Sequence, residues 1–254
     1  MTFLMVNGLK TFYMEFGSGN PIIFIHGATA NHEVWNRQIK FFAKKFKVIT
    51  LDLPGHGKSE NLRKKVLIED YSNHVAGFVS GLRLDKFFVV GHSMGGAIAM
   101  DFTLKNMEHV KSLVLVSTGV KLKIPSSFML SLRKNFEKTI LTDLKSLIFS
   151  EKTDKKLAER VVQESLKCPL KICLNDFIAC NNFDFNNMIS RIRIPTLIVV
   201  GKDDILTPVK YSFFLHEKIK NSKLEIIDDA GHMVMIEKPE QFNKIVFSFL
   251  NKIC

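Results

Sequence analysis

The sequence predicts an α/β protein built on a mostly parallel, doubly wound β-sheet. Short apolar runs alternate with helix-like stretches over residues 1–119, and the alternation resumes over residues 191–254. Runs such as residues 21–25 are apolar throughout, which is typical of strands buried on both faces of a parallel sheet. Residues 120–190 have helical spacing and no clear strand. We therefore expect one α/β core, formed by 1–119 and 191–254, interrupted by a helical insertion.

The elements of the first half follow in order. Residues 3–6 and 11–16 are strand candidates, and the Asn7-Gly8 pair between them is typical of a tight hairpin turn. Strands and helices then alternate as a strand at 21–25, a helix at 34–45, a strand at 48–51 and a helix at 67–82.

The second half continues the pattern on either side of the insertion. A strand at 85–90 precedes a helix that begins at Met94, and a strand at 110–116 follows. Within the insertion, apolar residues recur at helical spacing, namely Phe128, Met129, Leu132 and Phe136. After it we expect a strand at 196–200, a helix from about Pro208, a strand at 224–227 and a helix at 239–250.

The composition excludes several classes of protein. The chain has 254 residues, of which 46% are apolar and 24% charged, as in ordinary globular proteins. No apolar run approaches the roughly 20 residues of a membrane helix, and the first residues do not resemble a signal peptide. The four cysteines form no C-x-x-C pair and lie near no histidine cluster, being Cys168, Cys173, Cys180 and Cys254. We expect reduced thiols, a cytoplasmic location, no metal site and no cofactor.

The basic charge of the chain is uneven. The formal net charge is +11, and residues 120–193 hold 14 Lys or Arg against 8 Asp or Glu, whereas residues 194–254 hold 8 of each. A basic excess is compatible with an acidic partner, but a lysine-rich surface without any partner has the same signature. No nucleic-acid motif accompanies it, so we expect no nucleic-acid partner.

The most informative motif is Gly91-His92-Ser93-Met94-Gly95, which lies between a predicted strand and a predicted helix. This pattern is typical of a nucleophile elbow, a sharp turn that exposes a serine hydroxyl above the sheet. Flanking glycines leave room where a Cβ would collide with neighbouring chain. The helix that begins at Met94 directs free backbone N–H groups and a positive dipole toward the serine. Ser93 is therefore the candidate nucleophile.

A serine nucleophile needs a base and an acid that orients it, in the chain order Ser, Asp or Glu, His. Asp203 and Asp204 follow the predicted strand at 196–200, and His232 follows the last predicted strand. Loops at the carboxyl ends of parallel strands meet in space, so these side chains can reach Ser93. The spacing alone leaves open which of the two aspartates is the acid.

The loop after residues 21–25 reads His26-Gly27-Ala28-Thr29-Ala30. The backbone N–H groups of Ala28 and Met94 are placed to stabilise a developing oxyanion. We interpret the His26 side chain as a brace for this loop.

Five motifs in one order resemble the α/β-hydrolase fold superfamily over essentially the whole chain. They are HGATA, DLPGHGKS, GHSMGG, GKDDILTP and AGHMVMIEKPEQF. The resemblance implies the α/β-hydrolase fold, with a mostly parallel eight-stranded sheet flanked by helices and a helical cap at 120–190. In the family's acid-loop pattern the acid is the fourth residue, which implies Asp204.

The chemistry implied is acyl transfer. Epoxide hydrolases and haloalkane dehalogenases of this superfamily use an aspartate where this chain has Ser93, and the insertion contains none of the tyrosines, which are Tyr13, Tyr71 and Tyr211. We expect a serine carboxylic ester hydrolase that acts through an acyl-enzyme. Thioesterase, perhydrolase and C–C hydrolase activities, and a non-enzymatic ligand receptor on the same triad, remain alternatives.

The aromatic residues of the insertion and its surroundings suggest a pocket for an apolar acyl group. The candidates are Trp35, Phe128, Phe136, Phe149, Phe183 and Met233, with Phe177 and Phe185. The chain most resembles small carboxylesterases that include the pimeloyl-[acyl-carrier protein] methyl ester esterases. That resemblance implies a small ester substrate and an acidic acyl-carrier protein as a possible partner, met by basic residues of the insertion, Lys121, Lys123, Arg133, Lys134 and Lys138.

Overall fold

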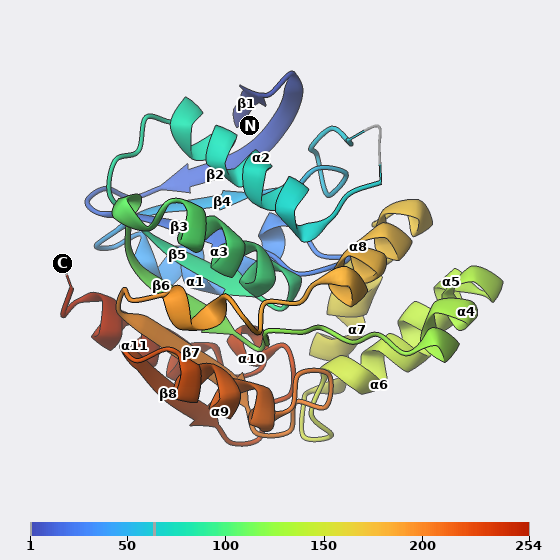
Figure 1. The fold of residues 1–254 in the computed structure, drawn as a ribbon. Coiled ribbons are helices and arrows are strands. Elements are labelled where there is room, and N and C mark those ends of the chain that lie inside the picture. Colours follow the sequence, from blue (N-terminus) through green and yellow to red (C-terminus); the bar gives the residue numbers. More distant parts are fainter. Residues whose placement is uncertain (1, 63–64, 254) are drawn as a thin grey trace.

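A computed structural model describes residues 2–62 and 65–253, so Cys254 lies outside the described residues. It contains one eight-stranded sheet in the order β1-β2-β4-β3-β5-β6-β7-β8 (Figure 1). The strands are β1 Thr2–Val6, β2 Leu9–Phe16, β3 Pro21–Ile25, β4 Lys47–Leu51, β5 Phe87–His92, β6 Val110–Val116, β7 Thr196–Gly201 and β8 Ser222–Ile227. The predicted eight-stranded α/β sheet is confirmed.

The first two strands differ from the rest in direction. Strand β1 pairs antiparallel with β2, and β2 pairs antiparallel with β4. Val6 lies opposite Leu9, so Asn7 and Gly8 form the two-residue turn, with φ of 50° and 80°. All later strand pairs are parallel, which brings their carboxyl ends to one edge of the sheet.

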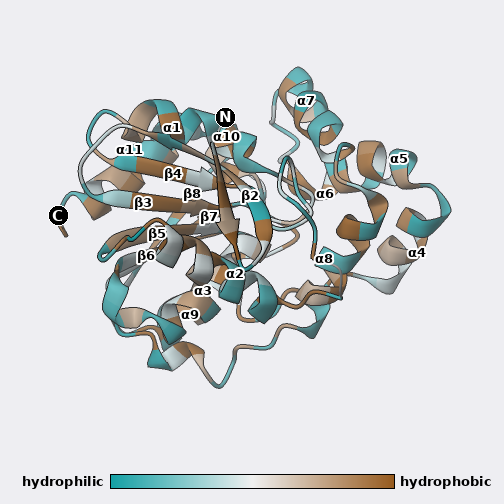
Figure 2. Cartoon of the chain, turned by 90° about the horizontal axis from the view of Figure 1, so that it is seen from above, coloured by the Kyte–Doolittle hydropathy of each residue, from teal (hydrophilic) through white to brown (hydrophobic). Residues whose placement is uncertain are grey.

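Helices cover both faces of the sheet (Figure 2). One face carries α2 Ile68–Gly81, α3 Met94–Lys105 and α9 Val209–Lys218, and the other carries α1 Asn36–Phe42 and α11 Pro239–Leu250. Alternate residues of one strand enter the two cores, because successive side chains point to opposite faces. In β3, Ile23 and Ile25 join the first core, while Ile22 and Phe24 join the second.

The segment between β6 and β7 is helical. It contains α4 Ser126–Lys134, α5 Phe136–Thr139, a π-helical turn at Ile140–Leu144, α6 Lys145–Ile148, α7 Lys155–Ser165 and α8 Leu170–Asn182. These helices lie together beyond the carboxyl ends of the parallel strands (Figures 1 and 2). A single β-bridge between Lys121 and Asp184 joins the two ends of the segment. We call residues 120–190 the helical segment.

Some boundaries differ from the sequence expectations. The expected helix at 34–45 begins as a 3₁₀ turn at His32–Trp35, because Asn31 caps it by accepting a hydrogen bond from the Glu33 amide. The short helix α10 Val234–Glu237 was not expected, since four residues are too few for a periodic signal. Among the described residues, no helix has both the length and the apolarity needed to cross a membrane.

Candidate active site

Ser93 occupies the sharp turn between β5 and α3. Its φ is 53° and its ψ −118°, a region that residues other than glycine rarely adopt. Two hydrogen bonds hold the backbone of this turn: the Ser93 amide donates to the Val116 carbonyl at 2.9 Å, and the Thr118 hydroxyl donates to the Ser93 carbonyl at 2.8 Å. The strained conformation is thus held by the end of strand β6 and by the residues that follow it.

The glycines on either side of Ser93 are required by space. A Cβ on Gly91 would lie 2.3 Å from the Gly95 carbonyl oxygen, and one on Gly95 would lie 2.3 Å from the Ile25 carbonyl oxygen. Both distances are far inside van der Waals contact with backbone atoms that cannot move aside. The elbow therefore packs as the sequence pattern predicted.

The loop after β3 lies directly beside the elbow. A Cβ on Gly27 would lie 3.2 Å from the Cβ of Ser93, so the two backbones nearly touch. Within residues 2–62 and 65–253, the N–H groups of Ala28 and Met94 donate to no protein acceptor. Ser93 is the N-cap of α3, so Met94 also contributes the positive end of the helix dipole. The arrangement offers free donors to an oxygen that gains negative charge.

His232 and Asp204 are joined by a hydrogen bond. The distance between His232 Nδ1 and Asp204 Oδ2 is 3.0 Å, and the Asp204 side chain is fully buried. Asp204 also accepts from the Thr207 amide at 2.9 Å and the Thr207 hydroxyl at 2.8 Å. Burial raises the pKa of Asp204, but His232 and the hydrogen bonds from Thr207 outweigh it and hold that pKa below its ordinary value. The carboxylate is therefore ionised and fixes the imidazole orientation.

The neighbouring Asp203 has a different partner. The Ser150 hydroxyl donates to Asp203 Oδ2 at 2.6 Å, outside the His232 contact. The structure thus places Asp204, and not Asp203, against the histidine.

The loop that carries His232 is hydrogen-bonded to residues 148–153, which comprise the last residue of α6 and the chain after it. The amides of His232 and Met233 both donate to the Ile148 carbonyl, at 2.9 and 3.2 Å. The Glu237 carboxylate accepts from the Gly231 amide and from the Ser150 amide, each at 3.0 Å. The position of the candidate base is thereby set by contacts on both sides of its own loop.

Two further histidines near Ser93 are structural. The His92 ring donates from Nε2 to the His232 carbonyl at 3.0 Å, and burial, with the nearby His232, lowers the pKa of His92 to about 3. The Leu53 amide donates to His26 Nε2 at 3.0 Å, so His26 braces the loop after β3 as expected. Burial lowers the pKa of His26 to about 4. Both rings are neutral at physiological pH.

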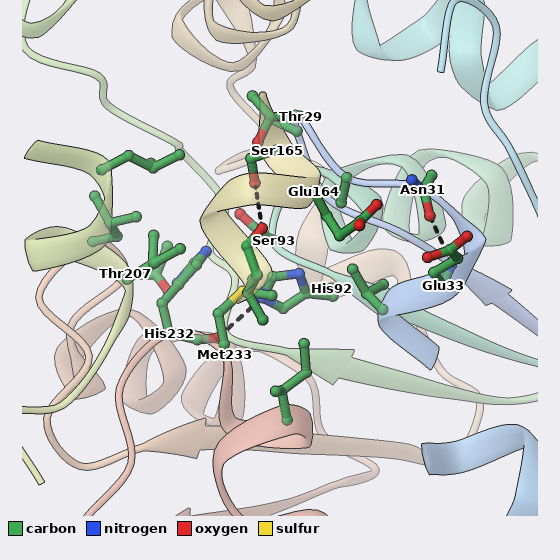
Figure 3. A pocket seen from close by; sticks show the side chains of 18 of the residues that line it. Thr29, Asn31, Glu33, His92, Ser93, Glu164, Ser165, Thr207, His232 and Met233 are labelled. Atoms are coloured by element: carbon green, nitrogen blue, oxygen red, sulfur yellow. Dashed lines mark hydrogen bonds between the residues drawn. The ribbon is translucent and has the colours of Figure 1, made fainter. Parts of the chain in front are cut away.

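A cavity of about 540 Å³ opens above Ser93 (Figure 3). Ser93, His92, His232, Thr207 and Met233 line its inner part, and Figure 3 shows them converging from separate elements. The helical segment supplies much of the apolar wall, namely Leu144, Ile148, Leu157, Val161 and Phe177. The cavity therefore has room for an apolar group next to Ser93.

Most of the expected pocket aromatics do not line the cavity, although Met233 and Phe177 do. Trp35 is fully buried against Phe24 in the core, and Phe128 packs edge-on behind Phe177. Phe183 stacks on Phe185 in the other core. Phe136 and Phe149 pack against the core as partly buried residues. These aromatic side chains fill the interior of the protein. Sequence spacing alone cannot distinguish a side chain that packs in the core from one that contacts a ligand.

Several cavity residues were missed by the sequence analysis. Thr207 lies inside the acid loop motif, so its place next to Asp204 could have been suspected. No sequence pattern marks the charged residues at the exposed opening of the cavity, because single exposed cations in helices are common. These residues include Arg37, Lys40 and Arg160.

Known proteins share both the sequence pattern and the fold. Residues 20–164 and 167–239 match the family described as alpha/beta hydrolase fold. The chain is 29% identical to 2-hydroxy-6-oxo-6-(2'-aminophenyl)hexa-2,4-dienoic acid hydrolase of Metapseudomonas resinovorans, over 98% of this chain and 90% of that protein. It is 27% identical to the pimeloyl-[acyl-carrier protein] methyl ester esterase of Wigglesworthia glossinidia brevipalpis, covering 95% and 98%. A thermophilic esterase of known structure is 32% identical, with a TM-score of 0.88 and coverage of 99% and 97%.

Proposed function

Because the chain belongs to the α/β-hydrolase fold family, we propose that it is a serine hydrolase that cleaves carboxylic esters through an acyl-enzyme. The observation that carries the proposal is one cavity lined by Ser93, in its strained turn, and by His232, which is hydrogen-bonded to buried Asp204. Ser93 is the nucleophile, His232 the base and Asp204 the residue that orients the base. The esterases among the similar proteins support this choice.

The reaction follows from these positions. His232 takes the Ser93 proton as Oγ attacks the ester carbonyl, and the carbonyl oxygen becomes an oxyanion within reach of the Ala28 and Met94 amides. The protonated imidazole then gives its proton to the leaving alcohol, and the acyl group stays on Ser93. Water, deprotonated by His232, releases the acid and regenerates the serine. The structure contains no Ser93–His232 hydrogen bond within the described residues, and such bonds commonly tighten only with substrate.

Replacement of the nucleophile tests the proposal. Ser93→Ala is expected to lower kcat with an aryl ester by roughly 10⁴–10⁶, because triad residues act as a unit. A fluorophosphonate probe should label the native protein at Ser93 and leave the variant unlabelled, as measured by mass spectrometry of the labelled peptide. Labelling at a different serine with activity retained would refute the assignment. A protein that binds esters without turnover would instead be a receptor on the same triad.

Carbon–carbon bond hydrolysis is the second candidate. It is favoured by the similarity to a relative named for the hydrolysis of a 2-hydroxy-6-oxo-dienoic acid. The two activities are separated by assaying aryl esters and a 2-hydroxy-6-oxo-dienoate side by side with the same preparation. Thioesterase and perhydrolase activities are compared in the same way, with acyl thioesters and with hydrogen peroxide. A kcat/KM for esters below the others would reassign the chemistry.

The charged residues around the cavity narrow the proposed class of substrate. Four cations line it, and all are exposed: Arg37, Lys40, Lys123 and Arg160. None of them is in a salt bridge within the described part of the chain. Of the two carboxylates in the lining, Glu164 is paired with Lys167 at 2.7 Å, and the other is Glu33. An apolar acyl group close to Ser93 and an anionic group at the outer end of the substrate fit this lining.

The expected carrier-protein surface is arranged differently. Of the basic residues expected to meet an acidic carrier, only Lys123 lines the cavity. Lys121 pairs with Asp184, and Arg133, Lys134 and Lys138 lie on α4 and α5. We therefore propose a small anionic ester as the substrate, with the helical segment acting as its lid, and keep the carrier protein as the alternative.

Two double variants distinguish these substrates. The variant R37Q/R160Q is expected to lower kcat/KM for an ester with a terminal carboxylate by roughly three- to tenfold, because exposed ion pairs contribute about 0.2–1 kcal/mol each. The neutral ester of equal length should be unaffected, and so should both esters in the matched control R133Q/K134Q. Loss of activity only with a carrier-linked ester, and only in the control variant, would favour the carrier protein. Equal kinetics for both small esters in all variants would contradict the anionic substrate.

The oxidation state of the cysteines is relevant to the cellular compartment of the protein. Cys168, Cys173 and Cys180 are buried free thiols, and burial raises the pKa of each thiol above its ordinary value. They are protonated and poorly reactive. This supports the proposal of a cytoplasmic protein that uses no disulfide.

A further inference from the structure

Asp176 is a charged residue of the helical segment that is buried completely. It lies on α8, and its side chain has 0% exposure. Its carboxylate accepts hydrogen bonds from the Tyr71 hydroxyl at 2.7 Å, from His56 Nε2 at 2.8 Å and from the Thr29 amide at 3.2 Å. All three donors belong to the α/β core. A buried carboxylate is retained only when it is paired and hydrogen-bonded, so these contacts define how α8 meets the core.

The Thr29 contact reaches the catalytic loop. Thr29 has a φ of 60°, which a β-branched residue rarely adopts, so something outside the residue must hold it there. The hydrogen bond from its amide to Asp176 fixes the orientation of the Ala28–Thr29 peptide. The next amide toward the N-terminus is that of Ala28, the proposed oxyanion donor. A rotation of the Ala28–Thr29 peptide would therefore also change the direction of the neighbouring Ala28 N–H.

The two other partners of Asp176, His56 and Tyr71, also present hydrogen-bond donors to its carboxylate. Burial disfavours the charged imidazolium of His56, but the charge and hydrogen bond of Asp176 outweigh burial and raise the pKa of His56. Burial and Asp176 together raise the pKa of Tyr71 well above its ordinary value, so the phenol stays a donor. The rings of His56 and His26 lie 4.9 Å apart, which joins this cluster to the brace of the same loop.

The same cluster has the composition of a metal site, but its hydrogen bonds fit a different role. His56, Cys168 and Asp176 offer ligand atoms within 4.8 Å of one another. Asp176 already accepts three hydrogen bonds, and burial keeps the Cys168 thiol protonated by raising its pKa. The donors surround the carboxylate as a closed network.

We propose that Asp176 is a positioning residue for the oxyanion loop, so that the helical segment contributes to stabilising the transition state as well as covering the substrate. This inference rests on the proposed serine hydrolase function. It assigns Asp176 no contact with substrate, since it acts through the Thr29 amide on the donor at Ala28.

The test compares Asp176→Ala and Asp176→Asn with Tyr71→Phe, using p-nitrophenyl butyrate. Asp176→Ala is expected to lower kcat by roughly 10²–10³, the effect of losing one oxyanion donor, while KM changes little. Asp176→Asn retains a side-chain oxygen for the Thr29 amide and is expected to recover most of that loss. Tyr71→Phe, the matched control, removes a partner of the other carboxylate oxygen and should leave kcat within about threefold, because the Thr29 bond remains.

A second measurement separates positioning from general damage. An aryl trifluoromethyl ketone forms an oxyanion on Ser93, so its Ki should rise in Asp176→Ala by the factor by which kcat/KM falls. Unchanged inhibitor affinity with lower kcat would overturn the proposal, and so would an equal loss of kcat in Tyr71→Phe. If Asp176→Ala does not fold, Asp176→Leu, which fills the space but offers the Thr29 amide no acceptor, carries the same comparison.

Hydrogen exchange tests the loop without any turnover. The peptide that contains residues 26–30 should exchange faster in Asp176→Ala than in Asp176→Asn and Tyr71→Phe, which both keep an acceptor for the Thr29 amide. Unchanged exchange would refute the positioning role. A native protein without turnover would count against the proposed function alone, because the exchange result stands independently.

Discussion

Two buried carboxylates each hold a residue that lines the cavity, and they come from different parts of the molecule. Asp204 lies in a loop of the α/β core and orients His232, 28 residues along the chain. Asp176 lies in the helical segment and holds the Thr29 amide, 147 residues away. The proposed base is thus oriented by a carboxylate of the core, although Ile148 of the helical segment also accepts hydrogen bonds from the His232 loop. The proposed oxyanion loop is held by a carboxylate of the helical segment. On these assignments the helical segment contributes to both sides of the site.

The largest expected loss of activity follows replacement of Asp204, which contacts His232. Asp204→Asn is expected to lower kcat by roughly 10³–10⁴, because the amide stabilises the wrong imidazole tautomer, as in serine proteases. Asp203→Asn is the matched control, since Asp203 contacts Ser150 and not His232. The kcat of Asp203→Asn should fall only severalfold, because the His232–Asp204 hydrogen bond remains. Steady-state kinetics with one aryl ester measure both variants.

Two outcomes would alter the comparison. A larger loss in Asp203→Asn than in Asp204→Asn would move the acid to the neighbouring residue. A loss in Asp204→Asn no greater than that in Asp176→Ala would show that the core and the helical segment contribute equally.

A smaller effect is expected on the free energy of unfolding, and it tests the His56–Asp176 pair. Because the pKa of His56 is raised in the folded protein, its charged form contributes stability below its unfolded pKa of about 6.5. That contribution is lost as pH rises through the folded pKa. His56→Gln should therefore lower the free energy of unfolding most at pH 6, by about 3–5 kcal/mol as for a broken buried pair, and less at pH 9. Urea unfolding at both pH values measures the difference.

The control for this prediction is His109→Gln, which alters an exposed histidine. It should change the free energy of unfolding by less than about 0.5 kcal/mol at either pH. A loss for His56→Gln that is constant across the pH range would show that the His56–Asp176 contact is an uncharged hydrogen bond.

The two sides also differ in what the sequence predicts. The sheet, the elbow at Ser93 and the acid and histidine loops rest on short local patterns, and local patterns specify local backbone well. Asp176 carries no such pattern, because its partners Tyr71, His56 and Thr29 are brought to it only by the packing of α8. Most of the expected pocket aromatics lie outside the cavity for a related reason. Helical spacing predicts that Phe128 is buried, but not whether a ligand or Phe177 covers it.

The two hydrogen bonds that the Ile148 carbonyl accepts from the His232 loop have a mechanical consequence. Ile148 ends α6, so any swing of that helix away from the sheet must either break these bonds or drag the imidazole with it. With His232 as the proposed base, admission of a substrate and the position of the base are therefore coupled. A passage that opens by moving α7 leaves these two hydrogen bonds intact, whereas one that opens at α6 displaces the imidazole from its place beside Asp204.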